Sequence, residues 1–217
     1  MNKLLYRLQH GWAVWLLVLI FLAAFLASFS ELQRTRSRFG EVTGRQFYDP
    51  KDKRYFAIRK MISGLAEPIV ILGDSITERA SFPESIDGHA LVNAGISGGT
   101  TLDFIAIAPA LLRDVKPAMI VIALGTNDIG SQTERQDYAA LLIALKKVCP
   151  NLLALAAPQR DGSILINAQI KAAAQSEGVR FIEIPLPDGS KLADNVHLND
   201  AGYRTWTPAV IAAIDAP

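Results

Sequence analysis

A run of four branched aliphatic residues, 69–72, leads directly into Gly73, Asp74 and Ser75. An uninterrupted apolar run of this length, bounded by Pro68 and Gly73, predicts a strand buried on both faces of a parallel sheet. Gly73 permits a tight turn at the end of that strand. Ser75 then lies past the carboxyl end of the strand, where open α/β sheets bind ligands, so it is a candidate nucleophile.

Strand and helix patterns alternate along the rest of the chain. Strands spaced by helical segments imply right-handed crossovers and a mostly parallel sheet with helices on both faces. We therefore predict one α/β domain built on a five-stranded sheet. The strands are expected at 69–72, 89–93, 118–124, 152–157 and 179–184, and the helices at 54–65, 101–115, 136–148, 163–175 and 200–214.

The N-terminus carries an almost unbroken apolar run over residues 12–29, preceded by Lys3 and Arg7. As a helix this run would extend about 27 Å, close to the thickness of the hydrocarbon core of a bilayer. We predict a transmembrane anchor, with a cleaved signal sequence ending near Ser28–Ser30 as the first alternative and a soluble core helix as the second.

This assignment divides the chain into three parts: an anchor or signal over 1–30, a basic juxtamembrane linker over 31–53, and a catalytic domain over 54–217. The basic residues before the apolar run favour export of the domain. A compact domain attached to one N-terminal span is also more commonly exported, so we expect it to be extracytoplasmic. Arg34 and Arg36 on the other flank favour the opposite orientation.

Composition excludes several classes of function. The 217-residue chain has a formal net charge of +1, which argues against nucleic-acid binding. Its one cysteine, Cys149, allows no internal disulfide, and no cluster of His, Cys or carboxylates has metal-ligand spacing. Neither Gly-x-Gly-x-x-Gly nor a Gly-Lys-Ser/Thr motif is present, which argues against nucleotide binding. We expect no metal and no cofactor.

Polar clusters follow the predicted strands at one edge of the sheet. They are 73–75 (Gly-Asp-Ser), 93–100 (Asn-Ala-Gly-Ile-Ser-Gly-Gly-Thr), 125–128 (Gly-Thr-Asn-Asp) and 194–199 (Asp-Asn-Val-His-Leu-Asn). These four blocks, in this order, resemble the SGNH (GDSL-type) serine hydrolases. The resemblance extends from about Glu67 to the C-terminus. It implies a flavodoxin-like three-layer α/β/α fold and hydrolysis of a small-molecule, lipid or carbohydrate ester.

A serine hydroxyl needs a base to take its proton. The chain has three histidines, of which His10 lies beside the apolar run and His89 opens a predicted strand. His197 remains as the base, and the resemblance also implies it. The base needs a partner that fixes its tautomer, and Asp194 can reach it across a turn. The family uses the Asp of its Asp-x-x-His motif in that role.

The resemblance assigns the oxyanion hole to the backbone N–H of Ser75, the backbone N–H of Gly98 and the side-chain amide of Asn127. Glycine suits the second position because the substrate carbonyl must approach the backbone closely. An amide suits the third because it donates a hydrogen bond without carrying charge. Asp74 and Asp128 are interpreted as structural residues that bond nearby loop backbone.

Two other interpretations remain. Residues 95–99 match Gly-x-Ser-x-Gly, so Ser97 is an alternative nucleophile of the α/β-hydrolase type. Against it, only about 180 residues follow the predicted anchor, and the blocks at 73–75 and 125–128 would go unexplained. The second alternative is a catalytically inactive, membrane-tethered binding module, although every expected functional residue is present.

Overall fold

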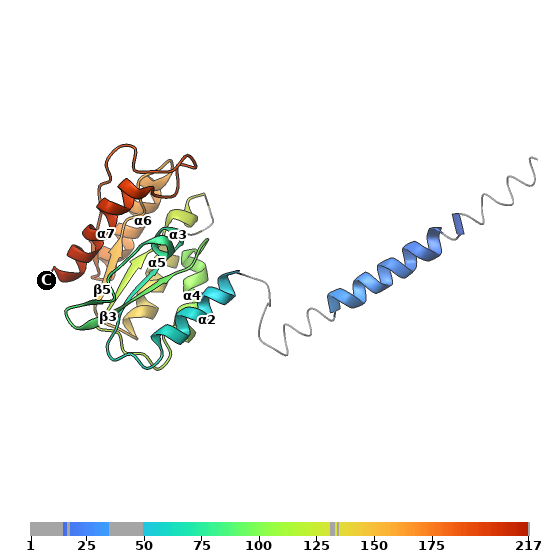
Figure 1. The fold of residues 1–217 in the computed structure, drawn as a ribbon, viewed down its shortest axis with the longest axis horizontal. Coiled ribbons are helices and arrows are strands. Elements are labelled where there is room, and N and C mark those ends of the chain that lie inside the picture. Colours follow the sequence, from blue (N-terminus) through green and yellow to red (C-terminus); the bar gives the residue numbers. More distant parts are fainter. Residues whose placement is uncertain (1–14, 17, 35–49, 131–132, 134, 217) are drawn as a thin grey trace, which may run out of the picture. The chain divides into compact units, whose positions relative to one another are not determined.

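The structure is a computed structural model, and it describes residues 15–16, 18–34, 50–130, 133 and 135–216. The chain divides into two units, Met1–Asp52 and Lys53–Pro217 (Figure 1). The three-part division predicted from the sequence, with boundaries at 30 and 53, stays a prediction.

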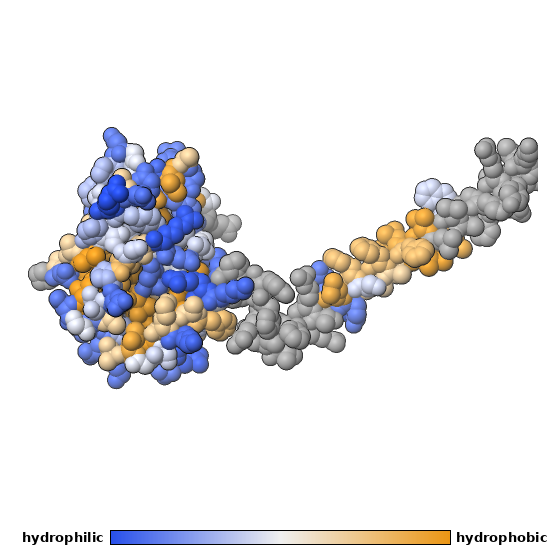
Figure 2. Space-filling model, in the orientation of Figure 1, coloured by the Kyte–Doolittle hydropathy of each residue, from blue (hydrophilic) through white to orange (hydrophobic). Residues whose placement is uncertain are grey.

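In the first unit, residues 15–16 and 18–34 are helical and carry exposed apolar side chains, among them Trp15, Phe21 and Phe25 (Figure 2). None of the helices in the described residues is both long enough and apolar enough to cross a membrane. The predicted transmembrane helix is therefore not found there, and positions 12–14 and 17 of that prediction lie outside the described residues. The predicted extracytoplasmic location stays a prediction.

The second unit contains a six-stranded sheet in the order β2-β3-β1-β4-β5-β6. All neighbouring strands run parallel except β2, which pairs antiparallel with β3. The five parallel strands, numbered among themselves, have the order 2-1-3-4-5, which is the flavodoxin-like order. The strands are β1 (Ile69–Gly73), β2 (Ser85–Ile86), β3 (His89–Gly95), β4 (Met119–Ala123), β5 (Leu152–Leu155) and β6 (Arg180–Ile182).

The prediction of five strands was wrong by one. The extra strand β2 is only two residues long, too short to show an alternating pattern. It joins β3 through Asp87 and Gly88, which both have positive φ angles, 48° and 83°. That geometry suits a two-residue hairpin, and the Asp-Gly pair is the sequence signal for one.

Helices cover both faces of the sheet (Figure 1). Alternate residues of β1 point to opposite sides: Val70 and Leu72 belong to one core cluster, and Ile69 and Ile71 to the other. The first cluster includes side chains of α2, α4, α5 and α6, and the second includes side chains of α3 and α7. The helices are α2 (Pro50–Ile62), α3 (Ser75–Arg79), α4 (Thr101–Leu111), α5 (Arg135–Lys146), α6 (Ser163–Ser176) and α7 (Asp200–Asp215). The predicted α/β layering is confirmed.

The strand register aligns the ends of the three central strands. Gly73 at the end of β1 pairs with Gly95 of β3 on one side and with Ala123 of β4 on the other. The loops that follow these three strands therefore begin at the same edge. In a flavodoxin-like sheet this edge, beside the first strand, is the usual place for a ligand site.

Candidate active site

The turn between β1 and α3 presents Ser75 as the first residue of a short helix. Asp74 caps this helix, because its Oδ1 accepts a hydrogen bond of 2.9 Å from the N–H of Ile76. A Cβ at position 73 would lie 2.1 Å from Oγ1 of Thr77, so the turn has room only for glycine. The hydroxyl group of Tyr203 on α7 donates to the carbonyl of Ile76 at 3.0 Å, and this bond ties the start of α3 to α7.

Ser75, His197 and Asp194 form a continuous hydrogen-bonded chain. Oγ of Ser75 lies 3.0 Å from Nε2 of His197, and Nδ1 of His197 lies 2.6 Å from Oδ2 of Asp194. The serine is 122 residues from the histidine in the sequence. In this arrangement the carboxylate holds the proton on Nδ1, which leaves Nε2 free to accept a proton from the serine.

Asp194 also shapes the turn that carries the histidine. Its Oδ1 accepts hydrogen bonds from the N–H groups of Val196 and His197, at 2.9 and 3.0 Å. The hydrogen bond to the His197 side chain, with these two backbone bonds, holds the pKa of the Asp194 carboxyl well below its usual range. The carboxylate is therefore ionised at neutral pH, as an orienting partner for an imidazole must be.

The two other expected oxyanion donors lie in neighbouring loops. Gly98 has a φ of +70° in the loop after β3, and Asn127 lies in a 3-10 turn, Thr126–Asp128, after β4. Nδ2 of Asn127 donates to the carbonyl of Gly99 at 3.0 Å. The loop after β3, which carries Gly98, is bound to the nucleophile turn by the N–H of Ile96, which donates to the carbonyl of Gly73 at 2.9 Å.

The two buried aspartates bond the surrounding loops. Asp128 accepts hydrogen bonds from Oγ1 of Thr101, at the start of α4, and from Oγ1 of Thr133, both at 2.8 Å. Burial raises the pKa of Asp74 from 3.8 to about 6. Asp74 and Asp128 thus make the kind of loop contacts that the sequence interpretation expected of them.

The alternative nucleophile is placed differently. Oγ of Ser97 donates to Oε2 of Glu78 at 2.6 Å, whereas the imidazole of His197 bonds to Ser75. Nδ1 of His89 lies 2.7 Å from the carbonyl of Glu67, a backbone contact at the opposite end of β3. His10 lies outside the described residues.

Sequence reasoning missed two residues that contact this edge. The side chains of Glu78 and Arg54 bond the backbone around the Gly95–Gly98 loop. Glu78 follows Ser75 by three residues, a spacing that places both on one short helix, so its proximity could have been inferred. Nothing in the sequence pattern indicates that Arg54 reaches the same loop. Within the described part of the chain, no group of three His, Cys, Asp or Glu side chains could hold a metal ion.

Residues 71–205 match the GDSL-like Lipase/Acylhydrolase family, which is more than half of the chain. The chain belongs to this family. The match includes the Ser75, Asn127, Asp194 and His197 blocks, and the predicted class of ester-hydrolysing enzyme is confirmed at the level of the family. A relative, Esterase TesA of Pseudomonas aeruginosa, is 38% identical over 77 residues. That alignment covers 29% of this chain and 38% of the esterase, so it spans well under half the length of the relative.

Solved structures share the fold of this GDSL-like family member. A Streptococcus pneumonia protein described as a platelet activating factor superposes with a TM-score of 0.66 at 20% identity, covering 82% of this chain and 99% of that one. An acetylxylan esterase from Geobacillus stearothermophilus gives 0.59 at 19% identity, over 72% and 98% of the two chains. A lipase/acylhydrolase from Enterococcus faecalis gives 0.56 at 18% identity, over 68% and 95%. At these identities the likeness establishes the fold alone.

Proposed function

We propose that the protein is a serine esterase that transfers the acyl group of a carboxylic ester to Ser75 and then hydrolyses the acyl-enzyme. The observation that carries this proposal is the unbroken chain of hydrogen bonds from Ser75 Oγ through His197 to Asp194. A serine, a base at hydrogen-bond distance and a third group that orients the base are the parts that this chemistry needs.

In the first half of the reaction, Oγ of Ser75 attacks the ester carbonyl carbon while Nε2 of His197 takes the hydroxyl proton. The tetrahedral intermediate collapses, the C–O bond to the alcohol breaks, and His197 gives its proton to the leaving alcohol. In the second half, His197 takes a proton from water as the water attacks the acyl carbon. Collapse returns the proton to Ser75 and releases the acid. Asp194 stabilises the imidazolium that forms in each half.

The negative charge on the carbonyl oxygen needs hydrogen-bond donors. We assign this role to the backbone N–H groups of Ser75 and Gly98 and to the side-chain amide of Asn127. The hydrogen bond from Asn127 to Gly99, the residue next to Gly98, supports the assignment because it ties two of the donors to each other.

We propose a small-molecule, lipid or carbohydrate ester as the substrate. The family match supports an ester substrate, because the family is one of lipases and acylhydrolases. We also propose that the N-terminal segment attaches the enzyme to a membrane with its catalytic domain outside the cytoplasm, because a compact domain attached to one N-terminal span is more commonly exported. Lys3 and Arg7 favour this orientation, and Arg34 and Arg36 favour the opposite one. Proteinase treatment of spheroplasts tests this: digestion of the domain without lysis is expected, and protection until lysis would overturn the location.

Hydrolysis of 4-nitrophenyl acetate tests the activity. We expect Ser75→Ala to lose at least about 10⁴-fold in kcat, since it removes the nucleophile. Asn127→Ala should lose about 10²- to 10³-fold in kcat with little change in KM, because the amide acts on the transition state. Ser97→Ala tests the alternative nucleophile and should keep kcat within about tenfold of wild type, because it removes a hydroxyl that the proposal does not use as nucleophile and keeps the bond from the Ser97 N–H to Glu78. A Ser75→Ala enzyme with wild-type activity, or a Ser97→Ala enzyme as inactive as Ser75→Ala is predicted to be, would overturn the proposal.

A further inference from the structure

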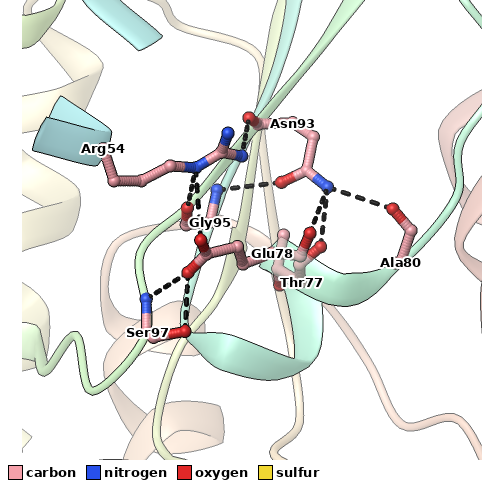
Figure 3. A network of polar contacts seen from close by, with 7 residues as sticks. All are labelled: Arg54, Thr77, Glu78, Ala80, Asn93, Gly95 and Ser97. Atoms are coloured by element: carbon pink, nitrogen blue, oxygen red, sulfur yellow. Dashed lines mark hydrogen bonds and ion pairs between the residues drawn. The ribbon is translucent and has the colours of Figure 1, made fainter. Parts of the chain in front are cut away.

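The carboxylate of Glu78 bonds the loop that carries Gly98. Its Oε2 accepts two hydrogen bonds from Ser97, one from the backbone N–H and one from Oγ, both at 2.6 Å (Figure 3). One carboxylate oxygen has enough lone pairs to accept both bonds. The residue that Glu78 fixes is therefore the immediate neighbour of the proposed oxyanion donor Gly98.

Arg54 of α2 reaches the same place from another direction. Its Nε donates to the carbonyl of Gly95 and its Nη2 to the carbonyl of Asn93, both at 2.9 Å, and Nε also lies 3.8 Å from Oε1 of Glu78 (Figure 3). The guanidinium thus joins the C-terminal end of β3 to the carboxylate of Glu78. A planar group with several fixed donors suits this bridging role.

Asn93 completes the link on the other side of the strand. Its Nδ2 donates to the carbonyl of Thr77 at 2.7 Å and to that of Ala80 at 3.2 Å, at the C-terminal end of α3, while its Oδ1 accepts from the N–H of Gly95 at 3.0 Å. The end of β3 approaches α3 so closely that a Cβ on Gly95 would lie 2.3 Å from the backbone nitrogen of Glu78. Side-chain hydrogen bonds and direct packing both join the two elements.

Glu78 links the helix of the nucleophile to the loop that carries Gly98. Ser75 and Glu78 belong to the same five-residue helix, and Ser97 adjoins Gly98. The bonds from Ser97 to Glu78 therefore restrict the position of the Gly98 N–H relative to the nucleophile, together with the bond from the N–H of Ile96 to the carbonyl of Gly73. Ser97 and Gly98 are themselves exposed, so the core does not enclose them.

We propose that Glu78 and Arg54 are positioning residues that hold the Gly98 N–H in register with Ser75 for the transition state. This inference rests on the proposed esterase function. Arg54 lies outside residues 71–205, the region that matches the family, so a helix that precedes the matched region contributes to the geometry of the site.

The test compares Arg54→Ala, Glu78→Ala and Glu78→Gln with wild type in the full chain. Arg59→Ala is the matched control: it lies on the same helix, pairs with Asp114 at 3.9 Å, and its side chain is 28% exposed against 25% for Arg54. Saturation with a fluorophosphonate counts the competent sites, so that kcat is expressed per active enzyme. The second readout is the Ki of a trifluoromethyl ketone, whose hydrated or serine-bound form mimics the oxyanion.

We expect Glu78→Ala and Arg54→Ala to lower kcat by about 10- to 100-fold with KM changed less than about threefold, because a displaced donor weakens transition-state binding only. The Ki of the ketone should rise by the same factor as kcat/KM falls. Glu78→Gln keeps an oxygen acceptor for Ser97 but loses the charge and the pair with Arg54, so it should recover part of the loss. Arg59→Ala should match wild type in kcat and Ki.

Three outcomes would overturn the inference while the esterase function stands. The first is wild-type kcat in both alanine variants, and the second is a raised KM with unchanged kcat. The third is a smaller number of competent sites with normal kcat per site. If Glu78→Ala does not fold, Glu78→Gln and Arg54→Ala still decide the question by kcat and Ki. An inactive wild-type enzyme that no fluorophosphonate labels would overturn the proposed function, and the inference with it. That result differs from the others because it affects the wild type and not the variants alone.

Discussion

The two halves of the proposed active site are built in different ways. Ser75 is 7% exposed and lies between buried strands and helices, whereas the Asp194 side chain is 46% exposed and that of His197 is 21% exposed. The nucleophile turn is held by residues far away in sequence, such as Tyr203, 127 residues from its partner Ile76. The acid–base turn is held by Asp194, which bonds residues two and three positions later.

This difference separates stability from chemistry. The nucleophile side depends on the packing of the whole domain, so changes there should cost both folding free energy and activity. The acid–base turn is local and exposed, so changes there should cost activity while the free energy of unfolding stays nearly constant.

The largest effect is expected for Asp194→Asn. The amide keeps Oδ1 as an acceptor for the backbone N–H groups of the turn, but its NH₂ replaces the oxygen that faces Nδ1 of His197. The imidazole would then carry its proton on Nε2 and could not accept the proton of Ser75, so kcat should fall about 10⁴-fold. Thermal unfolding should move by only about 2 to 4 °C, because the amide keeps the two backbone bonds but loses the bond to His197 that helps to lower the pKa of Asp194 and so stabilises the folded state.

Asp188→Asn, an exposed carboxylate earlier in the same loop, is the control and should leave kcat unchanged. An Asp194→Asn enzyme within tenfold of wild-type kcat would contradict the role of the carboxylate. A large loss of stability would contradict the description of the turn as local.

Two glycines, one on each side of the site, differ in how much space surrounds them. A Cβ at Gly95 would lie within 3 Å of the backbone of α3, which cannot move without shifting Ser75, so Gly95→Ala should cost about 3 kcal/mol in the free energy of unfolding. Gly189, in the segment before Asp194, has open space around it and a φ of +73°, so Gly189→Ala should cost only about 1 kcal/mol of backbone strain. Urea unfolding measures both, and equal costs would show that the two sides are equally constrained.

A pH-dependent effect concerns the buried carboxyl beside the nucleophile. Because burial raises the pKa of Asp74 above 3.8, to about 6, the folded state binds its proton more tightly than the unfolded state. The resulting stabilisation is fully present below about pH 4 and is lost as the pH rises through about 6, and it amounts to at most about 3 kcal/mol.

Asp74→Asn keeps an oxygen for the N–H of Ile76 and carries no charge. Relative to wild type, the variant should therefore gain up to about 3 kcal/mol in the free energy of unfolding between about pH 4 and pH 7. Unfolding in urea at several pH values measures this. A difference from wild type that stays constant over that range would show that Asp74 does not titrate in this way.

The parts of the molecule that could be predicted from sequence are those with short-range or repeated signals. The buried strands could be located because aliphatic runs such as 69–72 and 119–122 bury on both faces. The pair of Asp194 and His197 could be predicted because three residues of turn bring them together. The strand β2 was missed because two residues show no period, although Asp87-Gly88 marks its hairpin.

The parts that could not be predicted depend on tertiary packing. Apolar periodicity predicted a helix over 54–65, but not that Arg54 reaches the carbonyls of Asn93 and Gly95, 39 and 41 residues away. The predicted strand at 152–157 proved shorter, ending at Leu155. Beyond its end, the side chain of Asn167 on α6 bonds the N–H and C=O groups of Ala157, a contact that no local pattern reveals.

The most direct test of the central claim is to locate the serine that a fluorophosphonate modifies. Wild-type protein would be labelled, digested and mapped by mass spectrometry, with His197→Ala as the control. The account predicts label on the peptide that contains Ser75, and its loss in the control. Label on Ser97, or no label on folded protein that hydrolyses no ester, would contradict it.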